Sequence, residues 1–411
     1  MRDHLKIRGS LGDELSGKRI ALCVTGSISC YKAPDIARFL IRHGAEVIPL
    51  MSEEASKLLS PEVLYWATGV DPVVEITGEL EHVELTKGEG RVDAVLIAPA
   101  TESTISKVAK GISDNPVTLL VSCALGESIP VIVAPAMHDS MYSNALVKRS
   151  LNELRNEGVV VIPPLLEEGR AKLPPHEDIL DFVLYAVTEK DLTGVNCLVT
   201  TGSTREHIDN VRFVSNPSSG KMGIYVAREI WTRGGTVRLI RGHVEVPVPR
   251  WIDQVIGLSA GDMLEACTRV LSDSEPDAFF SVAAVSDYTP KVRVRGKVDT
   301  IEHPSYTLEL ITTEKIVKRV RALKPSIDIV LFRAVTDWPV DPKREMERYR
   351  RDVDPLLTVI NNVGRNDAGF GSELNESLIV SRSGKVINPG LIRKDKLAKI
   401  VVDSYLAERG R

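Results

Sequence analysis

The chain begins a buried strand twice with the same pattern, and this repetition limits the fold more than any other feature. Residues 18–25 (KRIALCVT) and 197–201 (CLVTT) each run into a Gly-Ser pair. Each start is followed by a helix-like segment and then by a second apolar strand, at 46–51 and at 236–241. Strands that alternate with helices form parallel sheets, because a parallel connection needs a crossover. The sequence therefore predicts an α/β fold with two Rossmann-like three-layer domains and mainly parallel sheets.

Further apolar segments complete the two predicted sheets. They predict strands at 94–98 and 131–134 in the first half, and at 278–283, 327–332 and 357–360 in the second half. We expect four parts: an N-terminal extension at 1–16, which is mobile, a first domain at 17–188, a polar linker at 189–193 and a second domain at 194–411.

Composition excludes several classes of function. The hydrophobic fraction of 43% and the formal net charge of −4 are typical of soluble globular proteins and give no reason to expect nucleic acid binding. Apolar runs such as 117–125 fall short of the roughly 18 residues of a membrane span, and the charged N-terminus is unlike a signal peptide. Five scattered cysteines without a C-x-x-C pair indicate a reducing cytoplasm, and neither a disulfide framework nor a zinc site.

A long loop between a predicted strand and a predicted helix indicates an anion site. Residues 201–223 (TGSTREHIDNVRFVSNPSSGKMG) are rich in Gly, Ser, Thr and Asn and lead into a helix expected at 221–231. The N–H groups at a helix start favour anions, so we expect a phosphate here. A dinucleotide fingerprint is absent, and Ser215 and Met222 replace the Gly and Ser/Thr of a P-loop. An ordinary connecting loop is the alternative.

Other candidate site segments follow from the same architecture. In open α/β sheets, ligands bind at the carboxyl ends of the strands. This rule selects 26–31, 99–104, 135–142, 202–223, 284–288 and 361–367. Two histidines, His82 and His138, have the side chain that exchanges protons near neutral pH. A single histidine is more often a solvated surface residue, and that alternative stays open for both.

Six motifs along the chain carry a family resemblance. They are GKRIALCVTGSISCYK (17–32), EHVEL (81–85), APAT (98–101), PAM--MY (135–142), T-GSTRE-ID-VR-VSN-SSGKMG (200–223) and AAVSDY (283–288). The first half resembles the homo-oligomeric flavin-containing cysteine decarboxylases, and the second half resembles phosphopantothenate–cysteine ligases. Residues 17–405 together are similar to the bifunctional coenzyme A biosynthesis enzymes that fuse the two in this order.

For the first half, the resemblance implies FMN and the oxidative decarboxylation of 4'-phosphopantothenoylcysteine to 4'-phosphopantetheine. FMN supplies the redox chemistry, while protein groups orient the reacting carbon and carboxylate. His82 matches the catalytic histidine of the family, His138 takes a catalytic position, and Met137 and Lys172 are assigned to substrate. The residues assigned to FMN are Thr25, Gly26, Ser27, Ser52, Pro99, Ala100, Thr101 and Ser103.

Two departures from the family pattern concern this half. His138 stands where the family motif has an asparagine that binds the substrate carboxylate, and an imidazolium would also bind a carboxylate. The segment 167–175 (EEGRAKLPP), which corresponds to a flexible clamp, lacks the cysteine that many bacterial members carry, so Lys172 or water would take its place as the acid. We favour a working variant. The alternative is a ligase whose flavin domain is inactive and structural.

For the second half, the resemblance implies the ligation of cysteine to 4'-phosphopantothenate through an acyl-cytidylate, with CTP and Mg²⁺. Asn216 matches the asparagine that contacts the acyl carbonyl, and Lys297 matches the catalytic lysine. The residues assigned to substrate and nucleotide are Gly202, Thr204, Arg205, Ser218, Ser219, Gly220, Lys221, Asp287, Phe332, Arg348 and Arg351. The usual F-x-A-E is replaced by residues 332–335 (FRAV) and the usual lysine pair by arginines, which leaves the choice between CTP and ATP open.

The resemblance also implies assembly and leaves other classes to be weighed. It implies trimers of the flavin half and dimers of the ligase half, which combine into a dodecamer. No metal ligands are assigned. A flavoprotein subunit that binds partner proteins is disfavoured by the intact second half, and a nicotinamide dehydrogenase is disfavoured by the absence of G-x-G-x-x-G after either strand start.

Overall fold

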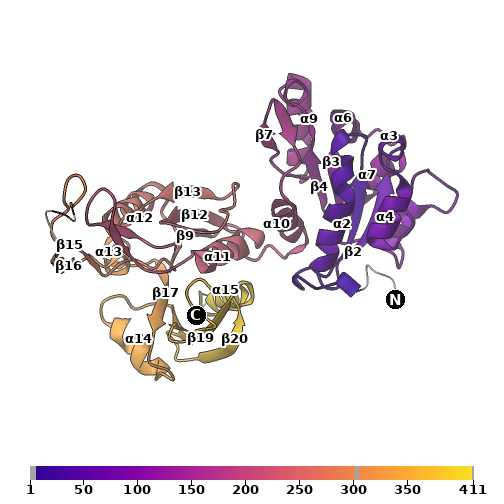
Figure 1. Cartoon of the computed structure of the whole chain (residues 1–411). Coiled ribbons are helices and arrows are strands. Elements are labelled where there is room, and N and C mark those ends of the chain that lie inside the picture. The colour runs from indigo at the N-terminus through magenta and orange to yellow at the C-terminus, as the bar shows by residue number, and fades with distance from the viewer. Residues whose placement is uncertain (1–5, 300, 302–304, 410–411) are drawn as a thin grey trace. The chain divides into compact units, whose positions relative to one another are not determined.

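The computed structural model describes residues 6–299, 301 and 305–409, and the chain forms two compact units, Met1–Glu189 and Lys190–Arg411 (Figure 1). The predicted linker 189–193 largely packs with the second unit. Leu192 is fully buried, and its N–H donates to the carbonyl of Arg233 at 3.0 Å. None of the described helices is long and apolar enough to cross a lipid bilayer.

The first unit is built on a five-stranded parallel sheet. Its order is β2-β1-β3-β4-β6, with β1 at Arg19–Val24, β2 at Glu46–Met51, β3 at Ala94–Ala100, β4 at Val131–Pro135 and β6 at Val160–Val161. Every residue of β3 and β4 is buried, which explains why these strands read as continuous apolar runs rather than as alternating patterns.

Helices connect the strands and cover both faces of this sheet. They are η1 (Ile28–Lys32), α2 (Ala33–Arg42), α3 (Glu53–Leu58), α4 (Pro61–Thr68), α5 (Glu81–Lys87), α6 (Glu102–Ala109), α7 (Pro116–Gly126), α8 (Asp139–Tyr142), α9 (Ala145–Asn156) and α10 (His176–Val187). Side chains of α5, α6, α7 and α9 pack with Ala21 and Cys23 of β1 on one face. Because side chains alternate along a strand, Ile20 and Leu22 point to the other face, where α2 and α10 contact the sheet.

The described part of the N-terminal extension, residues 6–16, is attached to the first unit. Backbone N–H groups of Gly9 and Leu15 donate to carbonyls at the end of α2, those of Ile41 and His43, at 3.1 and 2.9 Å. Leu15 is fully buried. An apolar anchor and backbone hydrogen bonds thus fix this segment to the first unit. Residues 1–5 of the predicted extension lie outside the described residues.

The second unit contains an eight-stranded sheet that is parallel over six strands. Its order is β13-β12-β9-β14-β17-β18-β19-β20. The strands are β9 (Asn196–Thr201), β12 (Thr236–Arg241), β13 (Asp253–Ile256), β14 (Ala278–Ser281), β17 (Asp328–Val335), β18 (Leu357–Asn362), β19 (Leu374–Ser381) and β20 (Val386–Arg393). The last two strands are antiparallel.

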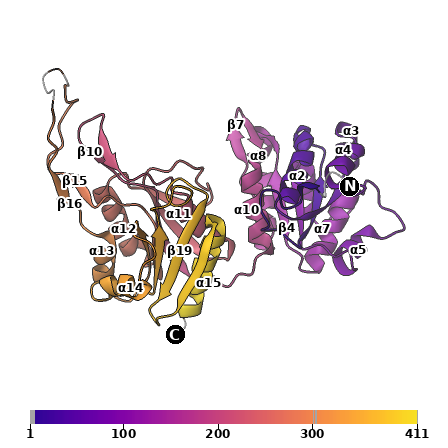
Figure 2. The ribbon, with the colours of Figure 1, turned by 60° about the horizontal axis from the view of Figure 1, so that its bottom comes forward.

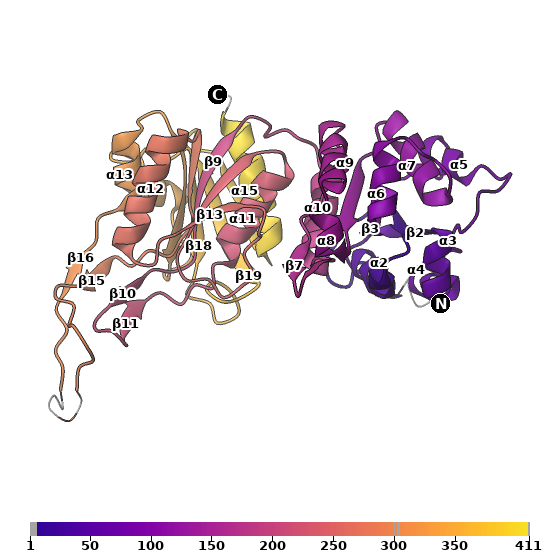
Figure 3. The same ribbon diagram turned by 90° about the horizontal axis from the view of Figure 1, so that it is seen from above.

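Two helical layers enclose the second sheet (Figure 3). The helices are α11 (Lys221–Thr232), α12 (Ala260–Ser274), α13 (Ile316–Leu323), α14 (Pro342–Arg350) and α15 (Lys394–Arg409). Apolar side chains of α11 and α15 pack on one face, whereas those of α12 and α13 pack on the other. The predicted α/β fold with three-layer domains and mainly parallel sheets is confirmed in both units.

Short hairpins stand outside the two main sheets. In the first unit, β5 (Met137–His138), β7 (Leu165–Glu167) and β8 (Arg170–Lys172) form a small antiparallel sheet. In the second unit, β10 (Arg205–His207) pairs with β11 (Phe213–Ser215), and β15 (Tyr288–Pro290) pairs with β16 (Leu310–Thr312). The β15–β16 pair belongs to an arm that extends away from the sheet (Figure 2).

Candidate active site

Three glycines allow the start of α11 to lie directly against the end of β9. Gly202 and Gly220 have φ angles of +81° and +82°, which L side chains rarely adopt. A Cβ atom on Gly202 would lie 2.3 Å from the carbonyl oxygen of His243. A Cβ atom on Gly223 would lie 2.3 Å from Oγ1 of Thr201. Glycine is therefore required here by close backbone approach.

The turn before α11 has the polar groups that an anion site needs. The hydroxyl of Thr201 donates to the carbonyl of Gly220 at 2.7 Å, and the N–H of Gly220 donates to Oγ of Ser218 at 3.3 Å. Gly220 is the N-cap residue of α11, and no side chain caps this helix start. The first N–H groups of the helix and its positive dipole end therefore face a cavity rather than a capping side chain.

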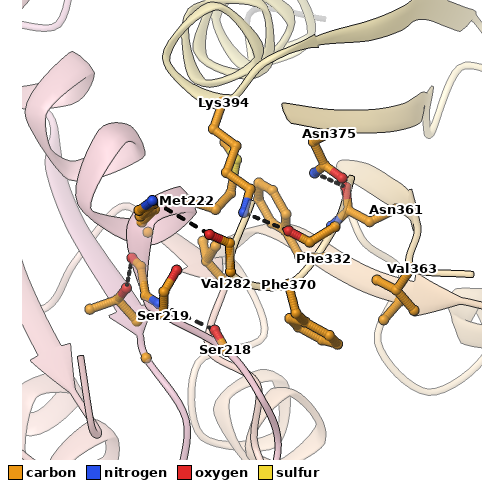
Figure 4. A pocket seen from close by; sticks show the side chains of 18 residues that line it. Ser218, Ser219, Met222, Val282, Phe332, Asn361, Val363, Phe370, Asn375 and Lys394 are labelled. Carbon is orange, nitrogen blue, oxygen red and sulfur yellow. Dashed lines mark hydrogen bonds between the residues drawn. The ribbon is translucent and has the colours of Figure 1, made fainter. Parts of the chain in front are cut away.

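A pocket lies at this helix start, and its walls come from segments far apart in the sequence (Figure 4). Lys221 pairs with the carboxylate of Glu373, which lowers the pKa of Glu373. Lys394, at the start of α15, enters the pocket from the opposite wall and donates to the carbonyl of Gly369 at 2.7 Å. The lining residues are Thr201, Gly202, Ser218, Ser219, Gly220, Lys221, Met222, Gly223, Val282, Phe332, Ala334, Asn361, Val363, Gly369, Phe370, Gly371, Asn375 and Lys394. Six of the predicted substrate and nucleotide residues are thus brought together: Gly202, Ser218, Ser219, Gly220, Lys221 and Phe332.

Asn216 and Thr204 connect the 201–223 loop to the segment after β14. The side-chain amide of Asn216 donates to the carbonyls of Ala284 and Val285 at 3.1 and 3.3 Å. The hydroxyl of Thr204, which is fully buried, accepts from the N–H of Ser286 at 2.9 Å. Both residues therefore fix the backbone at the carboxyl end of β14, next to the pocket.

Seven predicted residues of the second half do not line this pocket: Thr204 and Asn216, which lie next to it, and five others. Asp287 is exposed and forms an ion pair with Lys315. Arg205 stacks on the ring of Phe213, with its guanidinium carbon 4.5 Å from the ring centroid. Arg348 is paired with Glu345 on the surface of α14, and Arg351 is exposed just after this helix. Lys297 is exposed in the arm between β15 and β16.

Asp209, which the sequence did not single out, attaches the arm that carries Lys297. Its buried carboxylate accepts from the N–H groups of Val211 and Arg212, at 2.7 and 2.6 Å, and from that of Val298 at 3.1 Å. These backbone hydrogen bonds hold the pKa of Asp209 well below its usual range. An Asp in a loop gives no distinguishing signal, because its partner at Val298 lies 89 residues away.

Two further pocket residues were missed by the sequence. Lys394 is 5% exposed and Asn375 is 3% exposed, although both residue types are usually found at the surface. The side-chain amide of Asn375 donates to Oδ1 of Asn361 at 3.0 Å. Asn361 itself lies in the selected segment 361–367. The signal for the other two is their burial, which only the fold reveals.

In the first unit, hydroxyl groups gather at the carboxyl ends of β1, β2 and β3. The buried hydroxyl of Thr25 donates to the carbonyl of Pro99 at 2.7 Å and accepts from the N–H of Thr101 at 3.0 Å. Ser27, Ser52 and Thr101 each cap the helix that follows, and Gly26 is packed so closely that a Cβ atom would lie 2.5 Å from Cβ of Glu54. Three helix starts at one sheet edge fit the phosphate and polar ring edge of a flavin nucleotide.

The other residues assigned to FMN frame the same edge. Pro99 and Ala100 end β3 and are buried, and Ser103 is exposed in the first turn of α6.

The structure places three assigned residues of the first half on one small sheet: the substrate residues Met137 and Lys172, and His138, which was given a catalytic position. Met137 and His138 form β5, which pairs with β8, and β8 contains Lys172. His138 is exposed and opposes Arg170. Lys172 pairs with Glu167 and Glu168, and its hydrogen bond to Glu168 raises its pKa. The segment that corresponds to the clamp is thus a hairpin bonded to the strand that carries His138.

Within one chain, His82 does not lie beside the small sheet that carries Met137, His138 and Lys172. It lies half-buried on α5, beside Glu81. Figures 2 and 3 both show α5 apart from α8 and β7, which stand beside the strand that carries His138. Among the described residues, no cluster of three His, Cys, Asp or Glu side chains is arranged to hold a metal ion.

Comparison with known proteins identifies both halves. The family described as Flavoprotein matches residues 8–188, and the family described as DNA/pantothenate metabolism flavoprotein C-terminal domain matches residues 192–408. A coenzyme A biosynthesis bifunctional protein from Thermococcus kodakarensis is 40% identical over 93% of this chain and 94% of its own. The protein of the same name from Escherichia coli is 31% identical over 95% of this chain and 97% of its own.

A solved structure is similar to part of this chain. The C-terminal domain of a coenzyme A biosynthesis bifunctional protein covers 54% of this chain and 99% of its own length, with 27% identity and a TM-score of 0.45. Two family matches in tandem, and relatives matched over nearly their whole length, show that this chain belongs to the family of coenzyme A biosynthesis bifunctional proteins, which confirms the predicted fusion of a flavoprotein decarboxylase with a ligase.

Proposed function

We propose that the chain joins cysteine to 4'-phosphopantothenate with CTP, and that it then decarboxylates the product, 4'-phosphopantothenoylcysteine, with FMN. The observation that carries the ligase assignment is the pocket at the start of α11, where Ser218–Lys221, Phe332 and Lys394 meet. Relatives named as bifunctional proteins of coenzyme A biosynthesis support the combination of two activities in one chain.

The ligase half must first activate a carboxylate, because an amine attacks a free carboxylate poorly. The carboxylate attacks the α-phosphorus of CTP, pyrophosphate leaves, and the cysteine amine then displaces CMP from the acyl-cytidylate. We assign the phosphates to the turn Ser218–Lys221, where helix N–H groups and a lysine stabilise negative charge. Phe332 offers a ring for the nucleobase. Mg²⁺ usually binds through substrate phosphates and one or two carboxylates, so this proposal needs no preformed metal cluster.

In this proposal, Asn216 both holds the backbone after β14 and orients the acyl group. Its amide N–H groups are used by the carbonyls of Ala284 and Val285, so its Oδ1 remains to orient the acyl group. Lys297 would reach the acyl-cytidylate from the arm that Asp209 attaches, and it would promote the attack of cysteine.

The first half is proposed to hold FMN at the carboxyl ends of its strands. Ser27, Ser52 and Thr101 would bind the phosphate and ring edge, and bound FMN would oxidise the cysteine moiety. His138 would bind the carboxylate that is lost, and Lys172 or water would supply the proton.

We also propose a homo-oligomer, in which a neighbouring copy supplies His82. Two observations support it: the distance of α5 from the β5 sheet in one chain, and the exposed side chains of Ile28 and Tyr31 beside Ser27, at 72% and 64%. The five cysteines carry no disulfide, which agrees with a reducing cytoplasm as the proposed location.

Asn216→Asp tests the ligase assignment. Because an aspartate cannot donate to the two carbonyls and adds charge beside the acyl phosphate, we expect pyrophosphate release from CTP, 4'-phosphopantothenate and cysteine to fall at least about a hundredfold. Asn388→Asp, at an exposed position of β20, is the matched control. FMN content and decarboxylation should stay unchanged in both variants. Normal ligation by Asn216→Asp would contradict the assignment, and the same assay with ATP decides the nucleotide.

Carbon dioxide release tests the flavin half. The purified full-length chain should convert 4'-phosphopantothenoylcysteine to 4'-phosphopantetheine, with the product identified by mass. A preparation stripped of flavin is the control. No carbon dioxide above that control would leave a ligase with a structural flavin domain.

A further inference from the structure

A buried lysine without a carboxylate partner lies in the ligase pocket. Lys394 begins α15 and is 5% exposed. In the described part of the chain, its ammonium group makes one hydrogen bond, to the carbonyl of Gly369 at 2.7 Å, and no ion pair. A buried charge is costly unless it is paired, so an unpaired ammonium group in a binding pocket indicates a missing anion.

The side chain points toward the residues already assigned to phosphate. Figure 4 shows Lys394 descending from α15 into the pocket, which Ser218 and Ser219 line from below. An ammonium group has three protons, and the carbonyl of Gly369 uses one of them. Two donors therefore remain for a ligand between Lys394 and the uncapped start of α11.

A second atom of the same pocket lacks a partner. Oδ1 of Asn375 is buried, and it accepts no hydrogen bond from any described residue. Asn375 is held by its amide, which donates to Asn361. A buried acceptor without a donor costs free energy, and an organic ligand with an N–H or O–H group would satisfy it. The two unpaired groups together indicate a ligand that carries both an anion and a donor.

We propose that Lys394 binds a phosphate group of a ligase substrate and positions it against the start of α11. This inference rests on the proposed ligase function, and it adds a residue that the family motifs quoted above do not contain. The phosphate belongs either to the nucleotide or to 4'-phosphopantothenate. The hydrogen bond to the carbonyl of Gly369 holds the ammonium group of Lys394 in the pocket and leaves its other two protons for the phosphate.

The charge state of this lysine gives the binding a pH dependence. Burial, and to a lesser degree the neighbouring charge of Lys221, lower the pKa of Lys394 to about 8, against the opposing effect of Glu373. Lys221 and Tyr225 of α11, and Glu373 before β19, are the other titratable groups here. Above about pH 8, Lys394 loses its proton in the free protein, and phosphate binding should weaken.

Direct binding measurements test the proposal without requiring turnover. Calorimetric titration of the full-length chain with CTP and, separately, with 4'-phosphopantothenate compares wild type with Lys394→Met and Lys394→Arg. Lys324→Met is the matched control, because the ammonium group of Lys324 also donates to backbone carbonyls, those of Glu275 and Pro276, and to no side chain among the described residues. We expect Lys394→Met to raise one of the two dissociation constants about tenfold or more, and the affected ligand identifies the phosphate.

The remaining arms separate binding from a structural role. Lys394→Arg should retain affinity and lose the weakening above pH 8, because a guanidinium stays charged. Lys324→Met should bind both ligands as wild type does. Unchanged dissociation constants for both ligands in Lys394→Met would overturn the proposal, whatever happens to the unfolding midpoint. Failure of the proposed ligase function would be seen separately, because the wild-type protein would then release no pyrophosphate from CTP, 4'-phosphopantothenate and cysteine.

Discussion

Gly223→Ala places one methyl group between the first turn of α11 and the end of β9. The added Cβ atom would lie 2.3 Å from Oγ1 and 2.5 Å from Cβ of Thr201, whereas ordinary contacts begin near 3.4 Å. The helix start must therefore move by about 1 Å. Rotation of the Thr201 side chain would relieve the clash with Oγ1 but would break its 2.7 Å hydrogen bond to the carbonyl of Gly220.

The expected loss of stability follows from three contributions. Overpacking costs about 1–3 kcal/mol, and the strained hydrogen bond costs about 1 kcal/mol. The higher helix propensity of alanine over glycine offsets about 1 kcal/mol of this loss. The second unit should thus lose about 1–3 kcal/mol. A displacement of about 1 Å at the phosphate-binding turn should also lower ligase kcat/KM about tenfold to a hundredfold.

Gly261→Ala supplies the matched control and the refutation. Gly261 also lies in the first turn of a helix, α12, but its added Cβ atom would meet only Oγ of Ser259, at 3.8 Å. Urea unfolding followed by tryptophan fluorescence reports mainly on the second unit, which contains Trp231 and two of the other three tryptophans. If Gly223→Ala matches Gly261→Ala in unfolding free energy and in ligase kcat/KM, the close-approach argument is wrong.

Two further predictions concern other anchors. Thr25→Val leaves the carbonyl of Pro99 and the N–H of Thr101 without their hydrogen-bond partner. Flavin absorbance per chain should therefore fall, and the free energy of unfolding of the first unit should decrease by about 1–3 kcal/mol. Full flavin occupancy would contradict this role. Asp209→Asn places an amide donor against backbone donors such as the N–H of Val298. Hydrogen–deuterium exchange at residues 291–299 should therefore become faster, and ligase turnover should fall while the affinity for CTP is unchanged. Unchanged exchange would show that Asp209 does not hold the arm.

Much of the architecture was predictable because parallel strands are buried on both faces. The segments at 46–51 and 236–241 are strands over the predicted ranges. The antiparallel strands β19 and β20 were missed, because the connection from β18 contains no helix and breaks the alternation on which the prediction depended. The attachment of residues 6–16 to the first unit was missed because the segment buries one apolar side chain, Leu15, and a single anchor gives no periodic signal.

The candidate site was predictable where it follows a local motif. The turn Ser218–Lys221 lies at a helix start because glycine and serine terminate one element and begin the next. Lys394 and Asn375 gave no signal, because their role depends on an approach between segments more than 150 residues apart. The roles of all assigned residues remain predictions, and within the described chain neither His82 nor Lys297 lies at its proposed site.

The antiparallel end of the second sheet has a consequence for how the ligase half comes into being. β19 and β20 return the chain so that α15 packs beside α11, and the pocket takes walls from both helices. During synthesis, the first unit and most of the second sheet therefore precede the last wall of the pocket. A chain interrupted after β18 would retain a complete flavoprotein half and lack Lys394, so premature termination would uncouple the two activities rather than weaken both.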